Sequence, residues 1–152
     1  MTNRATSLLL IALLSAGLPG CSKPLSVEQQ VIAMIREMET RIENGERRPF
    51  MSHIADDFNG QNELMTRDQL GAYVIYQLNR HQRLHAQLFP IRVSETGEGT
   101  ASATFKALIT GGPGWLPESG QVYDFETHWR LEGGEWMLYR ANWTPTALDE
   151  IL

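Results

Sequence analysis

The sequence contains only one cysteine, Cys21, among its 152 residues. A disulfide within the chain is therefore impossible, and the chain after Cys21 has no cysteine for a metal site or a thiol nucleophile. Positive charge is also scarce, with 13 Lys and Arg against 18 Asp and Glu. This acidic balance argues against a nucleic-acid partner and against a basic surface that binds anionic lipid.

Apolar runs long enough to cross a membrane are also lacking near the N-terminus. The run from Leu8 to Leu14 is about half of the roughly 20 residues that a bilayer crossing needs. It follows the single cation Arg4 and precedes the small residues Ser15, Ala16 and Gly17, which is the layout of a secretory signal. We therefore predict that residues 1–20 are a signal peptide that is removed.

The four residues Leu18-Pro19-Gly20-Cys21 resemble the lipobox of bacterial lipoproteins: a branched aliphatic residue, a tolerant position, a small residue and then cysteine. The resemblance implies that the Cys21 thiol carries fatty acyl chains such as palmitate and that cleavage occurs before Cys21. The acyl chains would hold the protein on the periplasmic side of its membrane. Ser22 in place of Asp implies the outer membrane. An ordinary signal peptide with a chance cysteine is the alternative.

Residues 21–25 are then a lipidated tether, residues 26–144 one folded domain and residues 145–152 a C-terminal tail. The four residues between Cys21 and Ser26 span roughly 14 Å when extended, so we expect the domain to lie close to the bilayer. Removal of residues 1–20 takes only Arg4 from the charged residues, which leaves a formal net charge of about −6. The remaining chain has the size of a single domain.

Three helices are expected in the first half of the chain. Ser26 and Gln29 form a capping box before a run of apolar residues at helical spacing, and Asn44-Gly45 supplies its end. Pro49 can open a short second helix, which would end near residues 56–58. Thr66 and Gln69 cap the third. The expected inner faces are Val27, Val31, Ile35, Met38 and Ile42; Phe50, Met51 and Ile54; and Leu70, Tyr73, Val74, Gln77 and Leu78.

After about Arg83 the pattern becomes that of strands. Residues 84–93, 100–110, 121–131 and 135–143 are each strand-like and are separated by turns that contain glycine. In the third of these the inner and outer positions alternate, as in an antiparallel sheet with one buried face. Helices followed by strands predict an α+β fold with the helices laid across a curved sheet. The inner positions are Tyr123, Phe125, Thr127, Trp129 and Leu131, and the outer ones are Asp124, Glu126, His128 and Arg130.

Two stretches carry a family resemblance: Ala55-Asp56-Asp57-Phe58 after the first helices, and the hairpin from Trp129 to Trp136. With the order of elements over residues 26–144, they resemble the NTF2-like (SnoaL-like) superfamily. The resemblance implies a cone in which a bent, antiparallel sheet wraps around the first helix and leaves a cavity. Ketosteroid isomerases, epoxide hydrolases and polyketide cyclases use this cavity for catalysis, whereas many other members only bind or dimerise. The resemblance therefore does not specify a function.

Candidate acid/base groups are Asp57, Asp124, Glu126 and His128, which we would expect to titrate abnormally if the cavity were catalytic. Asp56-Asp57 can equally cap a turn or face water. The outer positions of the third strand would line the cavity only if the sheet register were inverted. His81 and His85 have i, i+4 spacing, but they lack the Glu of a His-Glu-x-x-His motif. We expect no metal and no cofactor.

The aromatic residues are the better evidence for a binding site, because an aromatic wall with a few polar groups suits a small apolar ligand. Gly111-Gly112-Pro113-Gly114 is a turn rather than a phosphate loop, and with Trp115 and Leu116 it could form a lip over the cavity. We predict a non-catalytic, membrane-anchored domain that binds a small apolar ligand or an envelope protein. An acid/base enzyme and a structural homodimer are the alternatives. The predicted lining is Tyr73, Phe105, Tyr123, Phe125, Trp129, Tyr139 and Trp143.

Overall fold

The computed structural model describes residues 23–81, 83–112 and 119–146. The predicted signal peptide, Cys21, residues 113–116 of the expected lip and residues 147–152 of the predicted tail lie outside the described residues. The helices of the described part are α1 (Val27–Glu43), α2 (Arg47–Ser52) and α3 (Arg67–His81), with the first two strands between α2 and α3. Its strands are β1 (Ile54–Gly60), β2 (Met65–Thr66), β3 (Leu84–Leu88), β4 (Arg92–Gly97), β5 (Thr100–Gly111), β6 (Ser119–Glu132) and β7 (Glu135–Pro145).

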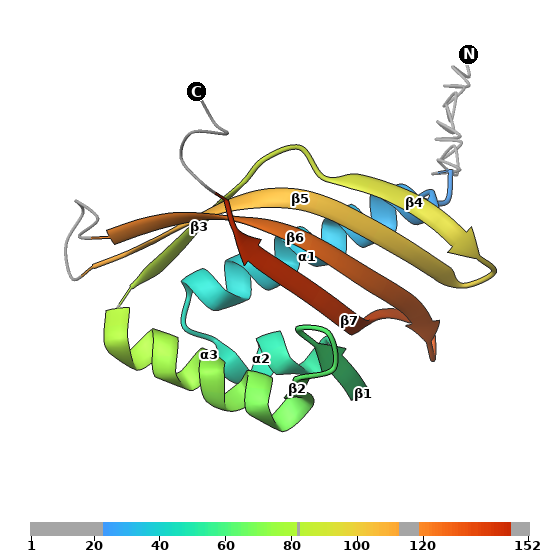
Figure 1. The fold of residues 1–152 in the computed structure, drawn as a ribbon. Helices are drawn as coiled ribbons and strands as arrows, with labels where there is room; N and C mark the ends of the chain where they lie inside the picture. The colour runs from blue at the N-terminus through green and yellow to red at the C-terminus, as the bar shows by residue number, and fades with distance from the viewer. Residues whose placement is uncertain (1–22, 82, 113–118, 147–152) are drawn as a thin grey trace, which may run out of the picture.

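The strands form one mixed sheet in the order β2-β1-β7-β6-β5-β3. Strand β4 pairs with the first half of β5, on the same edge that β3 occupies along the second half. All the pairs are antiparallel except β1 with β7, which is parallel. The long strands β5, β6 and β7 arch over α1, while α2 and α3 lie below it (Figure 1). The predicted α+β class, with helices laid across a curved sheet, is confirmed.

Local capping signals explain where two of the helices begin. The Ser26 hydroxyl accepts a hydrogen bond from the Gln29 backbone N–H, and the Gln29 side chain accepts one from the Ser26 N–H. Thr66 and Gln69 make the same reciprocal pair ahead of α3. Each pair satisfies backbone donors that a helix start leaves free. Both predicted capping boxes are confirmed.

The predicted short second helix is present, but its predicted end near residues 56–58 is wrong. It begins at Arg47 and ends at Ser52, and the residues from Ile54 to Phe58 form strand β1 instead. Pro49 therefore lies in the first turn of α2, where its missing N–H is tolerated. The residues after it pair in parallel with β7, and Ile54, Ala55 and Phe58 become buried. A partner about 80 residues later in the chain thus determines this element, which local sequence could not reveal.

The predicted strand over residues 84–93 is two strands, β3 and β4, both paired with β5. Leu88 lies opposite Ala107 and Arg92 lies opposite Thr104. The three residues 89–91 between β3 and β4 therefore face only two residues of β5, 105 and 106. Pro90 stands in this interruption. Because proline has no N–H to give to a ladder, it marks the place where the strand breaks.

The core lies between α1 and the inner face of the sheet. Val31 and Ile35 of α1 are buried against a surface that includes Ala101, Ala103 and Trp129. The two alanines are small enough to let the helix approach the sheet closely, and Trp129 is the largest side chain that is fully buried. Beyond the predicted domain end at 144, Thr146 is also buried. Among the described residues, no helix has the length and hydropathy of a membrane span.

Candidate ligand-binding site

The main cavity opens between the C-terminal half of α1, the helix α3 and the inner face of the sheet, with a volume of about 490 Å³. That volume is in the range of small-molecule sites in proteins. Its walls are mostly aliphatic and aromatic, from Ile35, Met38 and Ile42 on α1 to Leu88 on β3 and Ala107 on β5. The short side chain of Ala107, between Leu88 and Tyr123 on the neighbouring strands, helps to leave this space open.

An aromatic cluster forms one wall of the cavity. Phe105 and Phe125 stack across β5 and β6 with ring centroids 5.1 Å apart, and Phe125 lies 6.2 Å from Trp143 of β7. The Tyr73 ring of α3 lies next to Trp143, with ring centroids 6.2 Å apart, and Tyr123 packs edge-on against Phe125 with ring centroids 6.4 Å apart. Aromatic pairs at such distances add about 0.5–1.5 kcal/mol each beyond the burial of their area. The wall is therefore stabilised by its own contacts, without a ligand.

A few polar groups interrupt the apolar lining. The Tyr73 hydroxyl accepts a hydrogen bond of 2.7 Å from the Gln77 side chain. Burial, with Tyr73 nearby, raises the pKa of Tyr123 above its usual range, so this phenol stays neutral. Glu39, Arg80 and His81 also line the cavity. The prediction did not include these three, although helical spacing places Glu39 beside the inner residues Met38 and Ile42.

Six of the seven predicted aromatic residues line the cavity, and the exception is Tyr139. Opposite His128 and Trp129 of β6 stand Arg140 and Leu138 of β7, so Tyr139 between them has no partner. Such a bulge shifts the alternation of side chains by one residue. Tyr139 consequently lies near His128, at 6.1 Å between ring centroids, and under the Arg130 guanidinium, on the outer face of the sheet. The prediction that it lines the cavity is wrong.

The four acid/base candidates also lie outside the cavity lining. Asp124 pairs with Lys106 across β5 and β6 and accepts a hydrogen bond from Thr146, so its pKa is held below its usual range. His128 Nε2 lies 3.2 Å from Glu126 Oε1 on the same strand. These are the outer positions that the alternation predicted, and the inverted register that would have turned them inward does not occur.

Asp57 joins the same outer face from β1. Its carboxylate receives two hydrogen bonds from the Arg130 guanidinium, which also contacts Glu132. The hydrogen bonds from Arg130 lower the pKa of Asp57 and raise that of Arg130. A general base that works near neutral pH needs a raised carboxylate pKa. The shifts of Asp57 and Asp124 go the opposite way, and the outer face is thus a set of ion pairs.

The two histidines at i, i+4 spacing do not share a helical face. α3 ends at His81, and His85 belongs to β3, where its Nδ1 lies 3.7 Å from Glu43. The His81 ring instead packs on Gly111, where an added Cβ would lie 2.8 Å from it. In the described ranges there is no group of three or more His, Cys, Asp or Glu side chains placed to hold a metal ion.

No family model matches the sequence, and no curated protein is similar to it at the sequence level. Solved structures are similar in fold. A proposed dehydratase of the NTF2-like family from Streptomyces avermitilis is 19% identical with a TM-score of 0.68, over 79% of this chain and 96% of its own. An NTF2-like protein of unknown function from Pseudomonas putida KT2440 is 16% identical with a TM-score of 0.66, over 81% of this chain and 89% of its own.

Bd1075 of Bdellovibrio bacteriovorus is 8% identical with a TM-score of 0.69, over 79% of this chain. The matched region is only 41% of the Bd1075 chain, so the likeness concerns one part of a longer protein. At these identities the likeness concerns the fold and not the chemistry. The helices on a mostly antiparallel mixed sheet, with a cavity between them, have the NTF2-like fold.

Proposed function

We propose that this protein binds a small, largely apolar molecule in the cavity between α1, α3 and the sheet. The observation that carries the proposal is the cavity itself, about 490 Å³ with mainly aliphatic and aromatic walls. Burial of apolar ligand surface there would contribute about 25 cal/mol per Å². The Tyr73, Gln77 and Glu39 side chains provide hydrogen-bonding groups that would orient the ligand.

The cavity also supports the non-catalytic form of this proposal. The sequence suggested an enzyme through Asp57, Asp124, Glu126 or His128, and none of the four lines the cavity. Two of these carboxylates are committed to ion pairs with Arg130 and Lys106 on the outer face. Binding without turnover needs none of them.

The test is native mass spectrometry of the chain purified gently from a bacterial envelope, together with a variant in which the cavity is filled. Ala107→Phe places a large ring where a buried alanine lines the cavity. Thr104→Phe is the matched control, because Thr104 is exposed on the same strand. We expect a bound small-molecule mass in the wild type and in Thr104→Phe, and a reduced one in Ala107→Phe. Equal occupancy in all three would refute the proposal.

An acid/base enzyme is the second candidate, because Glu39 and His81 line the cavity even though the predicted groups do not. One structural neighbour is a proposed dehydratase, and dehydration is an acid/base activity. If the bound molecule is converted, Glu39→Gln and His81→Asn should each slow turnover, whereas Glu126→Gln on the outer face should not. If none of the ligands found in the cavity is converted by the protein, the enzyme alternative is refuted.

We also propose that the domain is held at the periplasmic face of a bacterial membrane, the outer membrane in view of Ser22, by lipid on Cys21. The supporting observation is the lipobox-like sequence before Cys21. Intact mass measurement of the chain from membranes should give the mass of residues 21–152 plus acyl chains. Cys21→Ser should abolish both the added mass and the membrane fractionation. An unmodified Cys21 in the wild type would contradict the proposal.

A further inference from the structure

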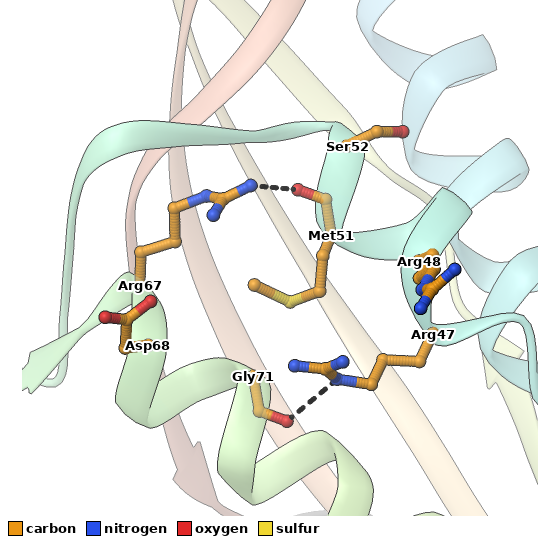
Figure 2. A pocket seen from close by; sticks show the side chains of 7 residues that line it. All are labelled: Arg47, Arg48, Met51, Ser52, Arg67, Asp68 and Gly71. Atoms are coloured by element: carbon orange, nitrogen blue, oxygen red, sulfur yellow. Dashed lines mark hydrogen bonds between the residues drawn. The ribbon is translucent and has the colours of Figure 1, made fainter.

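A second pocket, with a volume of about 320 Å³, lies where α2 meets the first turns of α3 (Figure 2). It shares no lining residue with the main cavity. Its charged residues are three arginines and one aspartate, in a chain whose formal net charge is −5. Three of the 13 Lys and Arg residues therefore line this pocket, against one carboxylate. The lining consists of Arg47, Arg48, Met51, Ser52, Arg67, Asp68 and Gly71.

Backbone carbonyl groups hold two of these arginines in place. Arg67 donates to the Met51 carbonyl oxygen at 3.2 Å and to that of Ile54 at 3.1 Å. Arg47 Nε lies 3.4 Å from the Gly71 carbonyl oxygen, in the direction that Figure 2 shows. A guanidinium has five N–H donors, so both groups keep donors for a further acceptor. Their positions are fixed before any ligand arrives, which reduces the entropy cost of binding.

The glycine at position 71 is what allows this approach. A Cβ on Gly71 would lie 3.1 Å from Arg47 Nη2 and 3.6 Å from the Met51 methyl group. With alanine at this position, the end of the Arg47 side chain would have to shift by a few tenths of an ångström. Glycine in a helix is unfavourable by roughly 1 kcal/mol relative to alanine, so the residue that opens the pocket reduces the stability of α3.

No carboxylate neutralises the two arginines on α2. Among the ion pairs formed by residues 23–81, 83–112 and 119–146, neither Arg47 nor Arg48 appears, and Arg67 reaches Asp56 only at 3.8 Å. Elsewhere Arg36, Arg41 and Arg130 each pair with a nearby glutamate or aspartate. The α2 arginines thus differ from these in having charge available for a ligand.

We propose that this pocket binds a phosphate ester that carries a hydroxyl group. Planar guanidinium groups match the oxygens of a phosphate in a bidentate way. The Met51 side chain offers an apolar contact for the carbon atoms next to the phosphate, and Asp68 in the same lining can accept a hydrogen bond from a hydroxyl group. Glycerol phosphate has this chemistry, both as a free molecule and as the headgroup of phosphatidylglycerol.

The first experiment measures the affinity of the full-length chain, purified in a non-ionic detergent, for sn-glycerol 3-phosphate. Thermal unfolding at constant ionic strength reports binding, because a ligand that binds only the folded state raises Tm. We expect Arg47→Gln/Arg48→Gln to weaken the affinity by about tenfold or more, as the loss of a charge-assisted hydrogen bond does. The control is Arg92→Gln/Arg140→Gln, which removes the same charge from exposed positions on β4 and β7.

The second variant, Gly71→Ala, separates binding from stability. It should raise the Tm of the ligand-free protein, because alanine favours the helix, and it should weaken glycerol phosphate binding, because Arg47 is displaced. Repeating the measurement in phosphatidylcholine vesicles with and without phosphatidylglycerol distinguishes the two sources of the headgroup. A Tm increase from phosphatidylglycerol that is lost in Arg47→Gln/Arg48→Gln assigns the site to the lipid headgroup, and a response to the free ester alone assigns it to a soluble ligand.

Two results would overturn the proposal. One is an equal loss of affinity in Arg47→Gln/Arg48→Gln and in Arg92→Gln/Arg140→Gln, which would mean that only the overall charge matters. The other is unchanged binding in Gly71→Ala, which would mean that the position of Arg47 against α3 is not used. Neither result bears on the main cavity, so this proposal and the apolar-ligand proposal can fail separately.

Discussion

The buried hydroxyl of Thr127 gives the sharpest test of how the inner face of the sheet is held together. Thr127 is 2% exposed and Trp129 is 1% exposed. The Thr127 hydroxyl donates to the Ala103 carbonyl oxygen at 3.0 Å and accepts from Trp129 Nε1 at 2.9 Å. One hydroxyl therefore satisfies the indole N–H of the largest fully buried side chain and ties β6 to β5.

Thr127→Val keeps the shape of the side chain and removes only these two hydrogen bonds. The lost bond to Ala103 costs about 1 kcal/mol, and the indole N–H left without a partner costs about 1–3 kcal/mol. Because the added methyl group recovers about 1 kcal/mol of this, we expect the free energy of unfolding to fall by about 1–3 kcal/mol. Thr127→Ser, which keeps the hydroxyl, should cost only about 1 kcal/mol for the lost methyl group.

Urea unfolding followed by tryptophan fluorescence measures both changes. With an m-value of about 2 kcal/mol/M, the midpoint of Thr127→Val should fall by about 1 M. Thr104→Val is the control, since Thr104 is exposed on β5 and surface substitutions usually stay within about 0.5 kcal/mol. A Thr127→Val midpoint equal to that of Thr104→Val would refute the reasoning, because the indole N–H would then have no need of Thr127.

Three further outcomes follow from the structure. Asp57→Asn should reduce the free energy of unfolding by up to about 1 kcal/mol at neutral pH, since the Asp57 side chain that pairs with Arg130 is 65% exposed. Arg130 lowers the folded-state pKa of Asp57, so this difference from wild type should vanish in acid titrations of unfolding as the pH falls below about 4 and through that pKa. Gly111→Ala should lower Tm more than Gly120→Ala, because the new methyl group would lie 2.8 Å from the His81 ring in one case and 3.3 Å from a Thr110 methyl in the other. Glu63→Gly should raise the free energy of unfolding by about 1 kcal/mol, because Glu63 has a φ of 73°, a conformation that costs an L-residue about this much. Glu98→Gly in the β4–β5 turn is the control and should give no such increase. The midpoints of urea unfolding of the two variants test this prediction.

The sequence predicted the elements whose signals are local. The capping boxes at Ser26 and Thr66 and the inner faces of α1 and α3 depend on residues within a few positions of each other. β1 depends instead on pairing with β7, far along the chain. Its first two residues, Ile54 and Ala55, are both buried, so it lacks the alternation that identifies a strand. The error over residues 54–58 thus has its origin in a contact that no local pattern records.

The same distinction applies to the two pockets. Alternation along β6 correctly placed Tyr123, Phe125 and Trp129 on the cavity side. The pocket that Arg47 and Arg67 share gave no comparable signal, because the two residues are separated by 19 positions and meet only when α2 packs on α3. Two adjacent arginines, Arg47-Arg48, were its only trace in the sequence. Such pairs are common on protein surfaces and predict no site by themselves.

The bulge at Tyr139 decides which face of the sheet carries which chemistry. Before it the buried residues of β7 are Trp136 and Leu138, and after it the buried residue is Ala141, so the inward positions change from even to odd numbers. If the alternation of Ala141 and Trp143 continued back along β7 without the bulge, Tyr139 would face the cavity and Arg130 would lose the ring beneath its guanidinium. The strands supply ion pairs to the outer face and mainly apolar side chains to the cavity. The side chains of Glu39 on α1, His81 on α3 and His85 on β3 line the cavity, so any acid or base acting there has to come from residues such as these.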